Sequence, residues 1–212
     1  MQVTILGAGN MARGIATRLL VGNHQVHILD RDAGQSAILV DELRSASEGR
    51  VSAGTIGDPL LGSVVVLAVP YVATLGLVKQ YGDQLNGLTV IDVTNPIKSS
   101  YDGLLTPADS SAAEEIAKAA DPGARIVKAF NTTFAGTLLT GQVAGMPLDV
   151  FLAGDDAEAK ATVASLVESG GMRPIDAGPL SRARFLEAAA FLHISAQFTL
   201  GTGFASALKI VC

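Results

Sequence analysis

Residues 3–12 of the chain read V-T-I-L-G-A-G-N-M-A, and this stretch decides the fold. Four residues that suit a buried strand precede a glycine turn, and a helical pattern then runs to about residue 21. Gly7 allows a tight turn, Gly9 lets the backbone approach a diphosphate, and the small Ala12 lets the helix pack close to the sheet. The amides at the start of this helix would face the ligand. The strand–turn–helix context predicts a dinucleotide site at Gly7, Gly9, Asn10 and Met11, the alternative being a packing turn without a ligand.

Strand-like and helix-like patterns alternate along most of the chain. Strands are predicted at residues 3–6, 25–29, 63–69, 88–93, 125–129, 149–153 and 173–176. Helices are predicted at 10–21, 33–47, 71–85, 111–120 and 156–169, with a further helical region from 180 onward that Gly201 and Gly203 break into two pieces. This alternation predicts one α/β domain over residues 1–212: a Rossmann-type, doubly wound, mostly parallel sheet with a short C-terminal helical extension at 180–212.

The composition narrows the choice of partners. The chain is 49% hydrophobic and 17% charged with a net charge of −5, and it holds no basic cluster, so nucleic acid and anionic membranes are poor partners. The only cysteine, Cys212, cannot form an intramolecular disulfide or a cysteine metal site. No apolar run is long enough for a membrane span, and the first strand leaves no room for a signal peptide. We therefore expect a soluble, cytoplasmic protein without a metal.

The ends of three strands are expected to contact the dinucleotide. Asp30, about 20 residues after the glycines, can accept from both ribose hydroxyls, which favours NAD. Arg31 points the other way because it can pair with the 2′-phosphate of NADP. Val69-Pro70 and Asn95-Pro96 close two further strands, so these turns should line the middle of the cofactor and the nicotinamide ribose. The alternative is that both prolines only stop strands.

Several longer motifs resemble one enzyme family. They are GAGNMARGIATRL at 7–19, VVLAVP at 65–70, VIDVTNP at 90–96, VKAFNTTFAG at 127–136, and FLAGDDAEAK followed by RPIDAGPLSRARFLE up to Glu187. Over nearly the whole chain, the sequence resembles the NADP oxidoreductases that use the deazaflavin coenzyme F420. It is also similar to the cytosolic reductase domains of the STEAP metalloreductases.

The resemblance implies direct hydride transfer between NADP(H) and a flavin-like ring, without a catalytic side chain. It places this ring over the nicotinamide, between the loop at 131–135 and the turn at 178–184. The residues expected there are Asn131, Thr132, Ala135, Pro179 and Leu180. Two positions depart from the family pattern. Asp30-Arg31-Asp32 stands where NADP-preferring members carry Ser-Arg-Arg or Ser-Arg-Asn, and Asn131 stands where deazaflavin enzymes carry His, so NAD and FMN or FAD stay open as alternatives.

A few other polar residues have simple structural interpretations. Arg184 and Glu187 are three residues apart on a helix, which predicts an intrahelical ion pair. Residues 155–156 are predicted to cap a helix rather than bind a metal. Lys128 would be the acid for a carbonyl or imine substrate, but a place on the core face of its strand is preferred. His193 is expected to be a core or interface residue.

Two further functions stay open at this point. The opening GAGNMA also looks like that of the pyrroline-carboxylate and imine reductases, although that family builds its substrate site from a larger C-terminal helical domain. A dinucleotide-sensing module without turnover would carry the same glycine turn. The helical region after residue 180 is apolar on more than one side and would need a cover, so we expect a homodimer formed through it.

Overall fold

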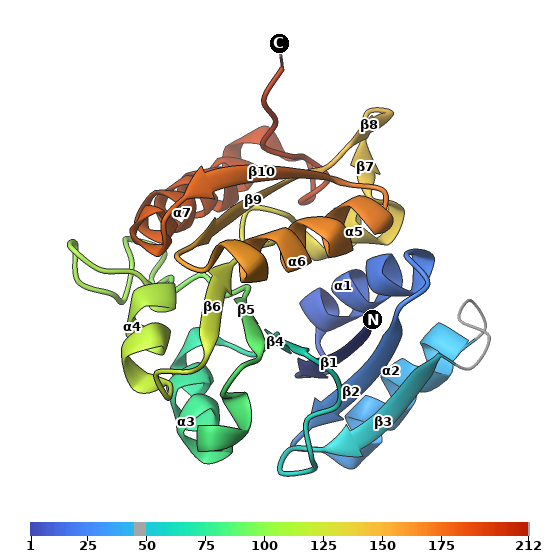
Figure 1. Ribbon diagram of the computed structural model, residues 1–212. Coiled ribbons are helices and arrows are strands. Elements are labelled where there is room, and N and C mark those ends of the chain that lie inside the picture. Colours follow the sequence, from blue (N-terminus) through green and yellow to red (C-terminus); the bar gives the residue numbers. More distant parts are fainter. Residues whose placement is uncertain (45–49, 212) are drawn as a thin grey trace.

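The computed structural model describes residues 1–44 and 50–211, which form a central sheet with helices on both faces (Figure 1). Six parallel strands lie in the order β3-β2-β1-β4-β5-β6. They are β1 (Gln2–Leu6), β2 (Gln25–Asp30), β3 (Val51–Thr55), β4 (Val64–Leu67), β5 (Thr89–Asp92) and β6 (Arg125–Lys128). After β3 the chain crosses back to the other side of β1, which is the doubly wound arrangement that creates a ligand crevice at the carboxyl ends of the strands. The predicted fold is confirmed.

Two more strands extend the sheet beyond β6. Strand β9 (Asp149–Gly154) pairs antiparallel with β6, and β10 (Arg173–Gly178) pairs parallel with β9. The sheet is therefore mostly parallel, as predicted, with one reversal of direction. A short hairpin of β7 (Gln142–Val143) and β8 (Met146–Pro147) stands apart from it.

Helices lie on both faces of the sheet. They are α1 (Asn10–Val21), α2 (Ala33–Arg44), α3 (Tyr71–Tyr81), α4 (Ala112–Ala119), α5 (Ala135–Thr140), α6 (Ala157–Ser169) and α7 (Ala183–Leu200), with 3-10 turns at Gly82–Leu85 and Leu180–Arg182. One apolar core joins the sheet to α1, α2, α5 and α6, and a second joins its other face to α3, α4 and the start of α7. Alternate residues of β1 feed the two cores, since Ile5 belongs to the first and Leu6 to the second. The predicted end of α2 at Ser47 lies outside the described residues.

The C-terminal region differs from its prediction. Helix α7 ends where Gly201 adopts a left-handed conformation with φ of +63°, and residues 201–211 are not helical, so the predicted second helical piece is wrong. These residues are instead held at the sheet edge. The buried Asp149 accepts from the Lys209 side chain at 2.8 Å, from the Ile210 amide at 2.8 Å and from Arg173 at 2.5 Å. These hydrogen bonds hold the end of the segment beside β9, and Phe204 nearer its start packs edge-on against Phe134.

Candidate functional site

The glycine turn between β1 and α1 has the geometry that a diphosphate site requires. Gly7 has φ of +113°, and a Cβ added there would lie 2.4 Å from the carbonyl oxygen of Ala68, so only glycine fits. A Cβ added at Gly9, in contrast, would have no heavy atom of the described residues within 4 Å. Gly9 caps α1 without a side chain, which leaves the first amides of the helix directed at this open space.

Asp30 at the end of β2 braces this turn. Its Oδ2 accepts from the amide of Ala8 at 2.9 Å, and its Oδ1 accepts from the amide of Asp32 at 3.0 Å. Both carboxylate oxygens are therefore engaged by the main chain, a role that the sequence did not reveal. Arg31 is exposed beside it and forms no ion pair with the residues that the structure describes.

A cavity of about 550 Å³ opens over the turn at the carboxyl ends of β1, β2 and β4. Its lining includes six of the predicted site residues: Gly7, Gly9, Asp30, Arg31, Val69 and Pro70. Val72, Ala73, Gly76 and Leu77 of α3 form the facing wall. The cavity thus combines a largely apolar wall, suited to a flat base, with main-chain amides suited to a diphosphate.

A second cavity, of about 340 Å³, continues from the first over β5 and β6. It shares Gly9, Val69 and Pro70 with the first, and Asn10, Met11, Asn95 and Asn131 join its lining. Phe130, just after β6, has a φ of +63°, which is a left-handed conformation that is unusual for a bulky residue. The chain bends at this point, directly before Asn131, which lines the cavity. Such strain is tolerated mainly where function needs it.

Asn95 and Asn131 form a reciprocal pair in this second cavity. Asn131 Nδ2 donates to Asn95 Oδ1 and to the carbonyl of Leu186, both at 3.0 Å, while Asn95 Nδ2 donates to the carbonyl of Asn131 at 2.7 Å. The pair fixes the orientation of both amides. Asn131 Oδ1 and Thr94 Oγ1 are buried and hydrogen-bond with none of the described residues. An acceptor and a hydroxyl of this kind suit the carboxamide of a nicotinamide.

A third cavity, of about 370 Å³, meets the second at Asn95. Phe134, Tyr101 and Phe204 are its aromatic residues, and Ile97, Lys98, Ser99 and Ile194 complete the lining. The ring of Phe134 lies 4.4 Å from that of His193, centroid to centroid, and His193 bonds Ser206 through Nε2 at 2.8 Å. The prediction of a core position for His193 is confirmed, since it is 7% exposed.

The four remaining predicted residues, Thr132, Ala135, Pro179 and Leu180, line none of these three cavities. Ala135 begins α5 directly after Phe134, and Thr132 is buried with an Oγ1 that bonds none of the described residues. Leu180 is buried in the second core, where its amide donates to Asp155, and neither it nor Pro179 lines any of the three cavities. Contact of these four residues with a bound ring stays a prediction.

A buried group of charges lies beneath the second cavity. Lys128 Nζ donates to Asp92 at 2.8 Å, to Glu187 at 2.8 Å and to the carbonyl of Thr94 at 2.6 Å, and all three charged side chains are 0% exposed. Burial raises the pKa of Glu187, while the charge of Lys128 opposes that rise. The predicted core position of Lys128 is confirmed, but its ionic partners were missed.

The predicted ion pair within α7 is wrong. Glu187 faces Lys128, whereas Arg184 pairs with Glu114 of α4 at 2.5 Å and 2.8 Å. An ion pair between helix residues three apart stabilises the helix by only a few tenths of a kcal/mol. Both side chains therefore pair with better-placed partners on other elements. The predicted cap at 155–156 is confirmed, since Asp156 accepts from the amide of Ala159 at 2.7 Å. Among the described residues, no three metal-binding side chains come together.

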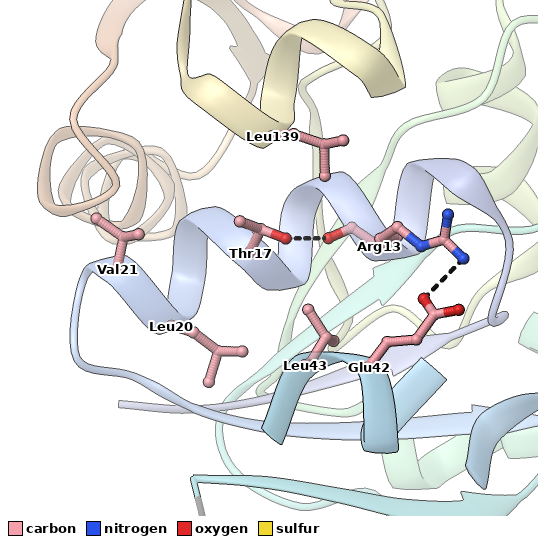
Figure 2. Close-up of a pocket in the computed structure, with 7 residues that line it drawn as sticks. All are labelled: Arg13, Thr17, Leu20, Val21, Glu42, Leu43 and Leu139. Atoms are coloured by element: carbon pink, nitrogen blue, oxygen red, sulfur yellow. Dashed lines mark hydrogen bonds and ion pairs between the residues drawn. The ribbon is translucent and has the colours of Figure 1, made fainter. Parts of the chain in front are cut away.

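A separate cavity of about 450 Å³ lies between α1, α2 and α5, and Figure 2 shows the residues that line it. Its walls are mostly apolar, formed by Leu20, Val21, Leu43 and Leu139. Arg13 and Glu42 close one end with a 2.8 Å ion pair. The cavity contains none of the predicted site residues and lies away from the glycine turn, so it is not part of the dinucleotide crevice.

Comparison with known proteins agrees with this geometry. The family model for the coenzyme F420-dependent NADP oxidoreductases matches residues 2–96. The chain is 34% identical over 203 residues to an F420-dependent NADP reductase from Methanothermobacter marburgensis, and the match covers 88% of each protein. The chain belongs to this family. It is accordingly an NAD(P)-dependent oxidoreductase.

Two further relatives mark the extent of the similarity. A crystal structure from Arthrobacter sp. FB24, provisionally named an F420-dependent NADP reductase, has a TM-score of 0.86 and 28% identity, with 99% of each chain covered. The metalloreductase STEAP3 of Rattus norvegicus is 32% identical over 187 residues, which is 88% of this chain. The chain spans only 36% of STEAP3. No helix among the described residues is both long and apolar enough to cross a membrane.

Proposed function

We propose that the chain transfers a hydride between NADP(H) and the ring of a deazaflavin such as coenzyme F420. The observation that carries this proposal is a series of three neighbouring cavities near the carboxyl ends of the strands. The first and second share Gly9 in their lining, and the second and third share Asn95. An extended dinucleotide would occupy the first two cavities, and a second flat ring would occupy the third, beside it. Family membership supports the same pair of cofactors.

In this proposal the first cavity holds the adenosine and the diphosphate. The amides after Gly9 would bind the diphosphate, and α3 would cover the base. Arg31 would pair with the 2′-phosphate, because it lines the cavity and forms no ion pair with the described residues. Asp30, whose oxygens both accept main-chain amides, would act as a brace for the turn more than as a ribose ligand. These contacts favour NADP over NAD.

The second cavity would hold the nicotinamide. Asn131 Oδ1 would accept from the carboxamide, Thr94 Oγ1 would bond its oxygen, and Met11 with Pro70 would pack against the ring. The reciprocal amide pair with Asn95 keeps Asn131 from rotating, so the orientation of its acceptor is fixed. In this arrangement the residues that follow β5 and β6 would determine which face of the nicotinamide points toward the third cavity.

The third cavity would hold the acceptor ring against Phe134. When both cofactors are bound, they supply the hydride chemistry themselves, and the chain needs no nucleophile or general acid. The task of the residues is to stack the two rings in contact and keep water out. Tyr101, Phe134 and Phe204 give the apolar surface for that task, and the nearby His193 serves as support for Phe134.

A matrix of initial rates tests this proposal. NADH and NADPH are each oxidised in the presence of F420, FMN, FAD or pyrroline-carboxylate, and absorbance is followed at 340 nm. The proposal expects the fastest turnover with NADPH and F420. Turnover with FMN or FAD but not with F420 would show that a flavin is the acceptor in place of the deazaflavin. Turnover with pyrroline-carboxylate would establish the imine-type alternative. Tight dinucleotide binding without any turnover would favour the sensing module.

We also propose a homodimer formed through α7, in a cytoplasmic protein. Four large apolar side chains of this helix are 62–72% exposed: Phe185, Leu192, Phe198 and Leu200. An exposed apolar surface of this kind is typical of an interface. Light scattering at micromolar concentration should give a mass twice that of one 21.7 kDa chain. The Leu192→Lys variant should have the mass of a single chain. A monomeric parent chain would contradict the proposal.

A further inference from the structure

None of the cofactor contacts proposed above involves the buried charged side chains of Lys128, Asp92 and Glu187. We propose that this cluster carries a net negative charge that favours the oxidised, positively charged nicotinamide over the reduced one in the second cavity. The inference rests on the proposed function, because it requires a nicotinamide beside Thr94. In this view the three residues position the site and tune its electrostatics without touching the reacting atoms.

The hydrogen bonds surround both acidic side chains with donors, as ionised carboxylates require. Glu187 Oε1 accepts from Lys128 at 2.8 Å and Oε2 accepts from the amide of Ala112 at 3.0 Å, so both of its oxygens face donors. Asp92 Oδ2 accepts from Lys128 at 2.8 Å, and its Oδ1 accepts from the amide of Thr94 at 2.9 Å. A protonated acid would need an acceptor that these contacts do not offer. One ammonium and two carboxylates leave one net negative charge.

The cluster is coupled directly to the nicotinamide cavity. Lys128 donates to the carbonyl of Thr94 at 2.6 Å, and Asp92 accepts from the amide of the same residue. Thr94 itself is one of the residues that line the second cavity. The side chains of Lys128, Asp92 and Glu187 are all 0% exposed, so no charge of the cluster lies in water. Screening by solvent is therefore weak along this path.

The consequence follows from the charges of the two cofactor forms. The nicotinamide ring is positive when oxidised and neutral when reduced, whereas the phosphates are unchanged. A buried negative charge nearby therefore lowers the free energy of the bound oxidised form selectively. The chain thereby promotes hydride donation from NADPH to the acceptor and disfavours the reverse step.

Equilibrium binding tests this role without measuring turnover. Isothermal titration at pH 7.5 gives the Kd of NADP⁺ and of NADPH for the parent chain, for Glu187→Gln and for Asp92→Asn. Both variants keep the shape of the side chain and remove one negative charge. Glu115→Gln is the matched control, because it removes a partly exposed carboxylate from α4 that pairs with Lys118. Two independent variants guard against a failure of either one to fold.

The expected result is a selective change in one ratio. The Kd of NADP⁺ divided by that of NADPH should rise about fivefold in Glu187→Gln and in Asp92→Asn, and stay constant in Glu115→Gln. A fivefold change corresponds to about 20 mV in the midpoint potential of the bound pair. Equal weakening of both forms, or no change, would overturn the electrostatic role. If the parent chain binds neither dinucleotide, the proposed function fails and the inference fails with it.

Discussion

Two glycines of the same turn should respond to alanine in opposite ways. At Gly7 the φ of +113° is unfavourable for alanine by about 1–3 kcal/mol. The new Cβ would also lie 2.4 Å from the carbonyl oxygen of Ala68 and 2.9 Å from its carbon, and moving β4 away costs about 1–3 kcal/mol more. The lower entropy of the unfolded variant stabilises the folded state and offsets up to about 1 kcal/mol of this loss. We expect Gly7→Ala to lose about 2–5 kcal/mol of unfolding free energy.

At Gly9 the same substitution should leave stability almost unchanged. Its φ of −82° and ψ of −171° suit alanine, and the Cβ meets no heavy atom of the described residues within 4 Å. The methyl group would instead occupy the space where the diphosphate approaches the first amides of α1. We expect a loss of stability below about 1 kcal/mol and a Kd for NADPH raised at least about tenfold.

Urea unfolding followed by circular dichroism measures the first effect, because the chain has no tryptophan to report on unfolding by fluorescence. Isothermal titration with NADPH measures the second. A Gly7→Ala variant as stable as the parent would refute the steric argument. A Gly9→Ala variant that binds NADPH normally would remove the glycine turn from the proposed site.

Three further substitutions probe other parts of the structure. Arg31→Ala should raise the KM for NADPH about tenfold or more and leave that for NADH within about twofold; an equal change for both would exclude a 2′-phosphate contact. Lys128→Met should cost about 3–5 kcal/mol in urea unfolding because it leaves two buried carboxylates unpaired, and a loss below 1 kcal/mol would contradict the ion-pair geometry. Asp149 is buried, which alone would raise its pKa, but donation from Arg173 and Lys209 lowers the pKa to about 2. Its contribution of about 2 kcal/mol is therefore complete above about pH 4 and is lost as the pH falls toward 2, and Asp149→Asn should flatten this part of the stability profile.

Much of the fold could be predicted from the sequence because its signals are local. The strand at 64–67 is four consecutive apolar residues, and the glycine turn can be recognised from the six residues G-A-G-N-M-A at 7–12. Strand β3 gave no such signal, since V-S-A-G-T at the sheet edge carries one strongly apolar residue. Helix α5 and the β7–β8 hairpin were missed because each element is six residues or shorter.

The site was less predictable where its contacts span long stretches of chain. Strand ends placed Asn95 near the cofactor, but its pairing with Asn131 joins residues 36 apart through the register of β5 and β6. The bond between Lys128 and Glu187 spans 59 residues and depends on how α7 packs over the sheet. The three-residue helix spacing predicted that Glu187 pairs with Arg184. In the structure Arg184 pairs with Glu114 instead.

Transfer of an isotope label tests the central claim most directly. NADPH carrying deuterium at the nicotinamide carbon that donates the hydride is mixed with the protein and oxidised F420 in ordinary water. Mass spectrometry then locates the label. If the second and third cavities hold the two rings in contact, deuterium from one stereospecific position appears on the reduced deazaflavin. Reduced F420 that carries hydrogen from the solvent instead would contradict direct transfer in this crevice.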